Sequence, residues 1–125
     1  MAKAKTAPIL WLDEPEDHNY PAAESYLTLT FEPGIAKALA QRLKKAAMSE
    51  FKAKDIFRAS ELSLLGVSNS HVSRDQEKIK KGVPLSPLLL VRHTAFARVI
   101  VADGYHRLCA VYTFDEDALI PCKIV

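Results

Sequence analysis

The sequence predicts a single α+β domain with a small mixed sheet and several helices. Short apolar runs bounded by turn residues, Leu88–Arg92 and the β-branched Val99–Val101, are typical of buried strands. Helical periodicity occurs elsewhere, since Ile35, Leu39 and Leu43 recur every four residues with polar residues between them. A chain of 125 residues has the length of one domain and can bury a core without disulfide or metal.

The N-terminal half divides into a flexible arm with an acidic loop (residues 1–20) and a mainly helical part (residues 21–60). We expect residues 1–7 to be disordered and residues 9–12 to form a short strand or a docking arm. Residues 23–31 fit either a helix or an alternating strand, and Pro21 favours a helix. An amphipathic helix is expected to follow over residues 35–44.

A short helix is expected over residues 53–59, with Phe51, Ile56 and Phe57 pointing inward. The apolar residues that follow should fill the core between the two halves; they are Leu62, Leu64 and Leu65.

The C-terminal part, residues 61–125, should contain the sheet. A helix over residues 71–81 has Ser68, Asn69 and Ser70 as possible caps and Gly82 as its stop. Strands at 88–92 and 98–102 precede a helix at 105–114 and a last strand at 119–124. Because a helix joins the last two strands, we expect them to pair in parallel, which makes the sheet mixed.

The turn between the strand at 98–102 and the following helix is the strongest candidate site. Gly104 allows a sharp turn, and a helix N-terminus favours an anion by roughly 0.3–2 kcal/mol. His106 and Arg107 are cations in a first turn, which points to an anion that the protein itself does not supply. The alternative is a polar helix start with solvated side chains. Asp103 could cap the helix, or it could hold Mg²⁺ or a substrate hydroxyl as a catalytic residue.

The stretch DGYHRLCAVY, between a strand and the final strand IPCKIV, resembles the signature of the ParB/sulfiredoxin superfamily. The similarity extends over about Asn69 to Val125 and implies that superfamily's fold. In that superfamily a Gly-x-x-Arg turn holds the phosphates of a bound nucleotide. The resemblance therefore assigns phosphate binding to the four matching residues; these are Gly104, Tyr105, His106 and Arg107. A bound nucleotide could bring Mg²⁺ with it.

The helix at 71–81 carries basic residues on one face, because His71, Arg74 and Lys78 are spaced by three and then four positions. Val72 and Ile79 lie together on another face and can anchor the helix in the core. In the superfamily, the matching helix supplies the remaining phosphate contacts. We expect the three basic groups to face Arg107 across a positive cleft, although an exposed basic stripe is the ordinary alternative.

Composition excludes several classes of function. A net charge of +2 does not by itself indicate nucleic acid, and no stretch approaches 18 apolar residues, so we expect no membrane span and a cytoplasmic protein. The four histidines and two cysteines lack metal-site spacing, so no metal site is predicted. Cys109 and Cys122 are expected to be buried, reduced thiols. Tyr105 occupies the place of the sulfiredoxin cysteine, so we expect no sulfinic acid reduction.

The residues thus predict a small protein that binds a nucleotide or another phosphorylated ligand at Gly104–Arg107. An NTP hydrolase or phosphotransferase activity stays open. The alternative is a nucleic-acid-binding or protein-binding module without catalysis, including an adaptor that binds no ligand. ParB proteins carry a helix-turn-helix region after this fold, and none occurs up to Val125, so we expect no sequence-specific DNA binding.

Overall fold

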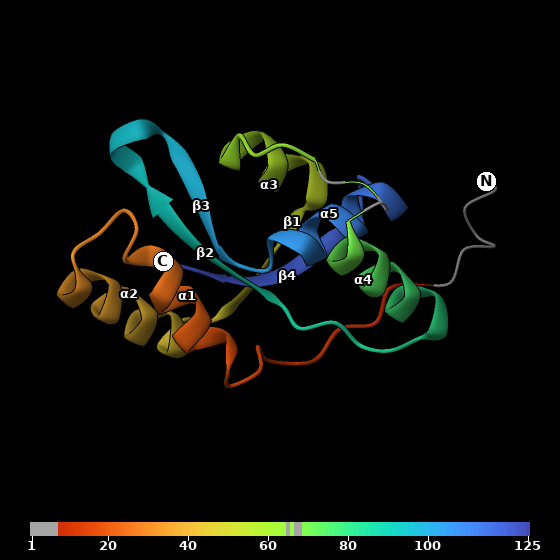
Figure 1. The fold of residues 1–125 in the computed structure, drawn as a ribbon, viewed down its shortest axis with the longest axis horizontal. Coiled ribbons are helices and arrows are strands. Elements are labelled where there is room, and N and C mark those ends of the chain that lie inside the picture. Colours follow the sequence, from red (N-terminus) through yellow and green to blue (C-terminus); the bar gives the residue numbers. More distant parts are fainter. Residues whose placement is uncertain (1–7, 65, 67–68) are drawn as a thin grey trace.

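The computed structural model describes residues 8–64, 66 and 69–125. Within these residues it contains five α-helices, a short 3₁₀-helix and four strands (Figure 1), which confirms the α+β class. In chain order the elements are α1 (Asn19–Leu27), α2 (Pro33–Lys45), β1 (Met48–Lys52), α3 (Ala53–Ser60), α4 (Ser70–Lys81), β2 (Leu88–His93), η2 (Thr94–Phe96), β3 (Arg98–Asp103), α5 (Tyr105–Phe114) and β4 (Leu119–Ile124). Three predictions concern residues outside the described ones: the disorder of residues 1–7, the place of Leu65 in the core and the cap Ser68.

The four strands form one mixed sheet in the order β1-β4-β2-β3. β2 and β3 form an antiparallel hairpin, β4 and β1 are antiparallel, and β2 and β4 are parallel. The mixed sheet is as predicted, but the parallel pairing of β3 with β4 is wrong. The tight β2–β3 hairpin occupies one side of β2, so the chain returning from α5 pairs on the other side of β2.

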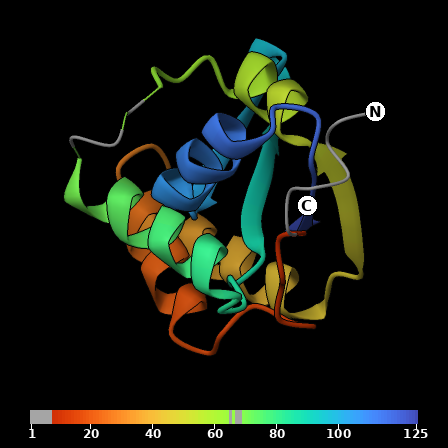
Figure 2. The same ribbon diagram turned by 90° about the vertical axis from the view of Figure 1, so that its right-hand side faces the viewer.

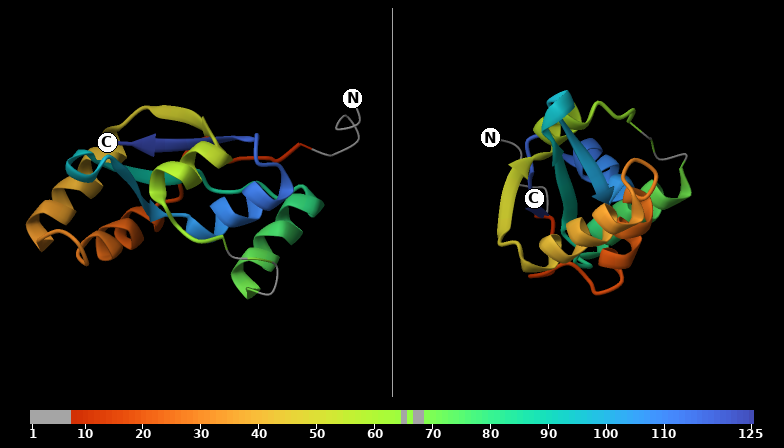
Figure 3. Two further views of the ribbon diagram at one scale, coloured as in Figure 1. Left: turned by 90° about the horizontal axis from the view of Figure 1, so that it is seen from above. Right: turned by 90° about the vertical axis from the view of Figure 1, so that its left-hand side faces the viewer.

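Helices cover both faces of the sheet. Leu89 and Val91 of β2 pack with α1 and α2, whereas Leu88 and Leu90 pack with α3, α4 and α5. A strand buried on both faces explains the continuous apolar run in the sequence. Figure 3 shows α1 and α2 lying together at one end of the molecule, and Figure 2 shows α4 beside α5.

The helix expected from Pro21 is confirmed as α1. Tyr20, Ala23 and Leu27 share its buried face, which an alternating strand would not bring together. The predicted helices at 35–44 and 53–59 correspond to α2 and α3.

Three expectations for the middle of the chain are wrong. Residues 48–52 lie inside the part predicted to be helical, yet they form the edge strand β1, because β4 supplies its backbone hydrogen-bond partners. Leu62 and Leu64 are exposed at 37% and 50% rather than filling the core. Phe51 is likewise exposed at 38%, while Ile56 is buried as predicted.

The N-terminal arm is docked where the structure describes it. Leu12 N–H donates to the Leu85 carbonyl at 2.8 Å, and Leu85 N–H donates to the Leu10 carbonyl at 2.9 Å. Trp11 and Leu85 form an isolated parallel bridge, so residues 10–12 make only a minimal strand contact.

Candidate functional site

A polar pocket of about 220 Å³ lies between α4 and α5, which run side by side (Figure 2). All seven residues predicted to bind phosphate line it, together with the two aspartates Asp75 and Asp103. The lining residues, here called the basic pocket, are His71, Arg74, Asp75, Lys78, Asp103, Gly104, Tyr105, His106 and Arg107. The expected meeting of the α4 basic groups with Arg107 is therefore present.

The α4 side of the pocket depends on how that helix is anchored. Val72 and Ile79 are buried at 0% and 3% exposure, as the sequence predicts. The basic groups lie on another face of the helix, and that face lines the pocket. The Asn69 side chain caps the helix by accepting N–H bonds from His71 and Val72 at 2.9 and 3.2 Å. Within the described residues neither Arg74 nor Lys78 makes an ion pair, so both charges are available to a ligand.

The α5 side begins with Gly104 in a left-handed conformation, at φ +109°. Leu108 N–H donates to the Gly104 carbonyl at 2.9 Å. The N–H groups of Tyr105, His106 and Arg107 precede this bond and have no acceptor within the helix. Gly104 supplies no side-chain cap for them, and the first residues of α5 line the pocket, so the positive end of the helix borders it.

Arg107 already has a carboxylate partner in the protein. Its Nη2 donates to Asp103 Oδ2 at 2.9 Å, and both side chains are 17% exposed. The expectation that no residue of the protein supplies an anion to this turn is therefore wrong for Arg107. Asp103 as a helix cap is wrong too, because its carboxylate accepts from this guanidinium. Arg107 Nε is buried without a hydrogen-bond partner among the described residues.

Asp75 is a pocket residue that the sequence reasoning missed. Its side chain is 9% exposed and has no hydrogen bond or ion pair within the described part of the chain. Burial raises the pKa of its carboxyl, and the cations Arg107 and Lys78 oppose that rise. Its spacing could have revealed it, since it follows His71 by four positions and precedes Lys78 by three.

The net charge of the pocket is modest. Three cations, Arg74, Lys78 and Arg107, face two carboxylates, which leaves one positive charge when the histidines are neutral. The rings of His71 and His106 lie with their centroids 4.7 Å apart. Burial lowers the pKa of His106, the nearby His71 lowers it further, and Asp75 opposes the change.

Tyr105 contributes its ring and its backbone to the basic pocket, whereas its hydroxyl is used in a hydrogen bond elsewhere. The hydroxyl donates to the carbonyl of Ser63, which ties the loop after α3 to the start of α5. Burial raises the pKa of Tyr105, and its neighbour Cys109 adds to the shift. Cys109 and Cys122 are fully buried thiols, and burial raises the pKa of Cys122 to about 12.

Metal ligands do not gather in the described part of the chain, where no group of three or more His, Cys, Asp or Glu side chains could hold an ion. None of the helices that the structure describes is long and apolar enough to cross a membrane.

The chain matches no protein-family model, no curated protein and no solved structure. The assignment of a function therefore depends on the geometry of the basic pocket itself.

The two pKa shifts predict that the pocket binds anions more tightly in acid. His106 gains its charge as the pH falls below its usual value of 6.5, and Asp75 begins to lose its charge above its usual 3.8. The first change adds a positive charge and the second removes a negative one, so both make the pocket more positive. We expect sulfate, which stays doubly charged, to bind severalfold more tightly at about pH 5 than at about pH 8. Isothermal titration calorimetry measures this change.

His106→Gln should reduce the pH dependence of sulfate affinity, because it removes one titrating group. A lowered pKa also means that the unfolded state takes up the proton first, so the native state loses stability as the pH falls below 6.5. Thermal unfolding must therefore be followed at each pH. Sulfate affinity that stays constant or falls on acidification would contradict the prediction.

Proposed function

We propose that this protein binds the phosphate group of a nucleotide or another phosphorylated small molecule in the basic pocket. One observation carries the proposal: Arg74, Lys78 and Arg107 meet the open N-terminus of α5 around a single small cavity. Charge-assisted hydrogen bonds to phosphate and a helix N-terminus act together on the same anion. The ParB/sulfiredoxin-like fold inferred from Gly104–Arg107 is part of this proposal.

The size of the pocket suggests which part of the ligand it holds. Its volume of about 220 Å³ is below the range of about 300–1,000 Å³ usual for drug-sized ligands. Its lining is polar, with neither a leucine nor an isoleucine in it. The pocket therefore suits one or two phosphate groups, while a base or sugar would lie over its rim.

Catalysis would be an extension of this binding, as an NTP hydrolase or a phosphotransferase with Mg²⁺ brought by the nucleotide. Such a reaction needs a group that accepts a proton from water or from a hydroxyl. Asp103 is held by Arg107, whereas the Asp75 carboxylate has no such partner among the described residues. We therefore favour Asp75 over the sequence candidate Asp103 for that role.

Arg74→Ala tests the binding proposal with little risk to the fold, because Arg74 is exposed and makes no ion pair among the described residues. We expect the variant to bind pyrophosphate about 10- to 100-fold more weakly, which corresponds to roughly 1.5–3 kcal/mol for a charge-assisted contact. Isothermal titration calorimetry gives the dissociation constants.

Arg42→Ala is the matched control, since Arg42 is an exposed arginine of α2 and does not line the pocket. It removes the same charge and should leave pyrophosphate affinity nearly unchanged. Equal weakening by the two variants would mean that only net charge matters, and the basic pocket would then not be the site.

A further inference from the structure

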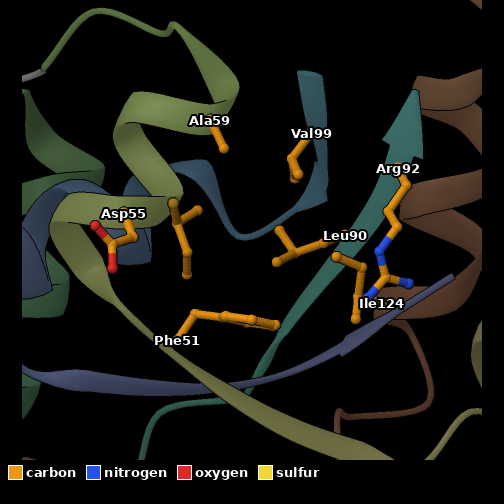
Figure 4. Close-up of a pocket in the computed structure, with 8 residues that line it drawn as sticks. Phe51, Asp55, Ala59, Leu90, Arg92, Val99 and Ile124 are labelled. Atoms are coloured by element: carbon orange, nitrogen blue, oxygen red, sulfur yellow. The ribbon is translucent and has the colours of Figure 1, made fainter. Parts of the chain in front are cut away.

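A second pocket, of about 250 Å³, lies between α3 and the sheet (Figure 4). Its lining is mostly apolar and shares no residue with the basic pocket. We call it the apolar pocket; it is lined by Phe51, Asp55, Ile56, Ala59, Leu90, Arg92, Val99 and Ile124.

All four strands contribute to the floor of the apolar pocket. Side chains alternate between the two faces of a strand, so Leu90 and Arg92 of β2 stand on the face that α3 covers. Phe51 of β1, Ile124 of β4 and Val99 of β3 complete the floor. α3 has only eight residues, and beside it the side chains of Phe51 and Arg92 stay exposed at the rim of the pocket.

Arg92 is the cation of the apolar pocket. It makes no side-chain hydrogen bond or ion pair among the residues that the structure describes, and its guanidinium lies beside Ile124 in Figure 4. Asp55 lies at the opposite side, and its carboxylate points away from the apolar side chains (Figure 4). That carboxylate lies on the exposed side of α3, with 3.6 Å between Arg58 Nη2 and Asp55 Oδ1. Among the described residues, the Arg92 guanidinium is therefore the cation of the pocket that has no side-chain partner, and it lies beside an apolar floor.

The geometry points to a binding site for a small organic monocarboxylate with an apolar body. The carboxylate would accept both hydrogen bonds that the Arg92 guanidinium can donate side by side, and the apolar body would lie against Phe51 and Val99. A protein cavity of about 150 Å³ suffices for benzene, so about 250 Å³ holds one ring or a short branched chain with its carboxylate.

Three probes applied to the native protein separate the two contributions to binding. Benzoate carries both the ring and the charge, benzyl alcohol carries the ring alone, and acetate carries the charge alone. We expect benzoate to bind with a dissociation constant of ~1 mM or below and at least about tenfold more tightly than either of the others. Each titration is monitored by the NMR chemical shifts of the residues that line the apolar pocket.

Two variants locate the interaction. Arg92→Gln should weaken benzoate about tenfold and leave benzyl alcohol unchanged, whereas Ala59→Phe fills the cavity and should weaken both. Arg42→Gln on α2, an element that does not line this pocket, is the matched control for the loss of charge.

Benzyl alcohol binding as tightly as benzoate would overturn the proposal, as would unchanged benzoate affinity in Arg92→Gln. Absence of any saturable benzoate shift up to about 10 mM would overturn it as well. Because the two pockets share no lining residue, these outcomes leave pyrophosphate binding at the basic pocket unaffected.

Discussion

Replacing Gly104 with alanine is expected to lower the free energy of unfolding by about 2–4 kcal/mol and to abolish anion binding at the basic pocket. Gly104 has φ +109°, a conformation that residues with a side chain rarely adopt. A Cβ there would stand 2.8 Å from Leu88 Cγ and 2.9 Å from Arg107 Nη2. Leu88 belongs to the buried core and cannot easily move away, so the clash should cost stability. Chemical denaturation measures this loss.

Gly34→Ala is the matched control for this substitution. Gly34 lies in α2, and a Cβ built there meets nothing within 4 Å. Alanine favours helix over glycine by up to about 1 kcal/mol, so stability should be unchanged or slightly higher and pyrophosphate affinity unchanged. If Gly104→Ala proved as harmless as Gly34→Ala, the described geometry of the turn would be wrong.

Arg107→Ala should have the second largest effect, because it removes a proposed phosphate contact and leaves the Asp103 carboxylate without its partner. Asp103 is 17% exposed and would lose its partner, so we expect a loss of about 1–3 kcal/mol of stability. Pyrophosphate affinity should fall by at least about tenfold. Denaturation and calorimetry measure the two effects separately.

The double variant Asp103→Asn with Arg107→Ala separates stability from binding. Removing both charges takes away the unpaired carboxylate, so most of the lost stability should return while pyrophosphate binding stays weak. Recovery of binding in the double variant would show that Arg107 serves only to neutralise Asp103.

The local elements were predictable because each depends on residues close together in the sequence. Asn69 and Gly82 mark the two ends of α4, and the change from β-branched residues to helical spacing at Gly104 marks the start of α5. Both signals are local hydrogen-bonding and steric effects. The sequence also predicted the basic residues of the basic pocket, because the basic face and the apolar anchors of α4 must lie on different sides, but it did not reveal Asp75.

Features that depend on distant partners could not be predicted. β1 forms because β4 lies beside it, and residues 48–52 alone have no strong strand pattern. The pairing of β4 with β2 rather than β3 likewise depends on which edge the hairpin leaves open. Asp103 and Arg107 are only four positions apart, but the sequence leaves open whether Asp103 caps α5 or pairs with Arg107, and the structure shows the pair and no side-chain cap.

Titration of the native protein with pyrophosphate, followed by amide NMR, tests the central claim most directly. Saturable binding should shift the backbone amide signals of Tyr105, His106 and Arg107 together with the side-chain signals of Arg74, and the shifts should give one dissociation constant. Pyrophosphate binding that shifts other residues and leaves those signals unchanged, or no saturable binding at all, would contradict the account.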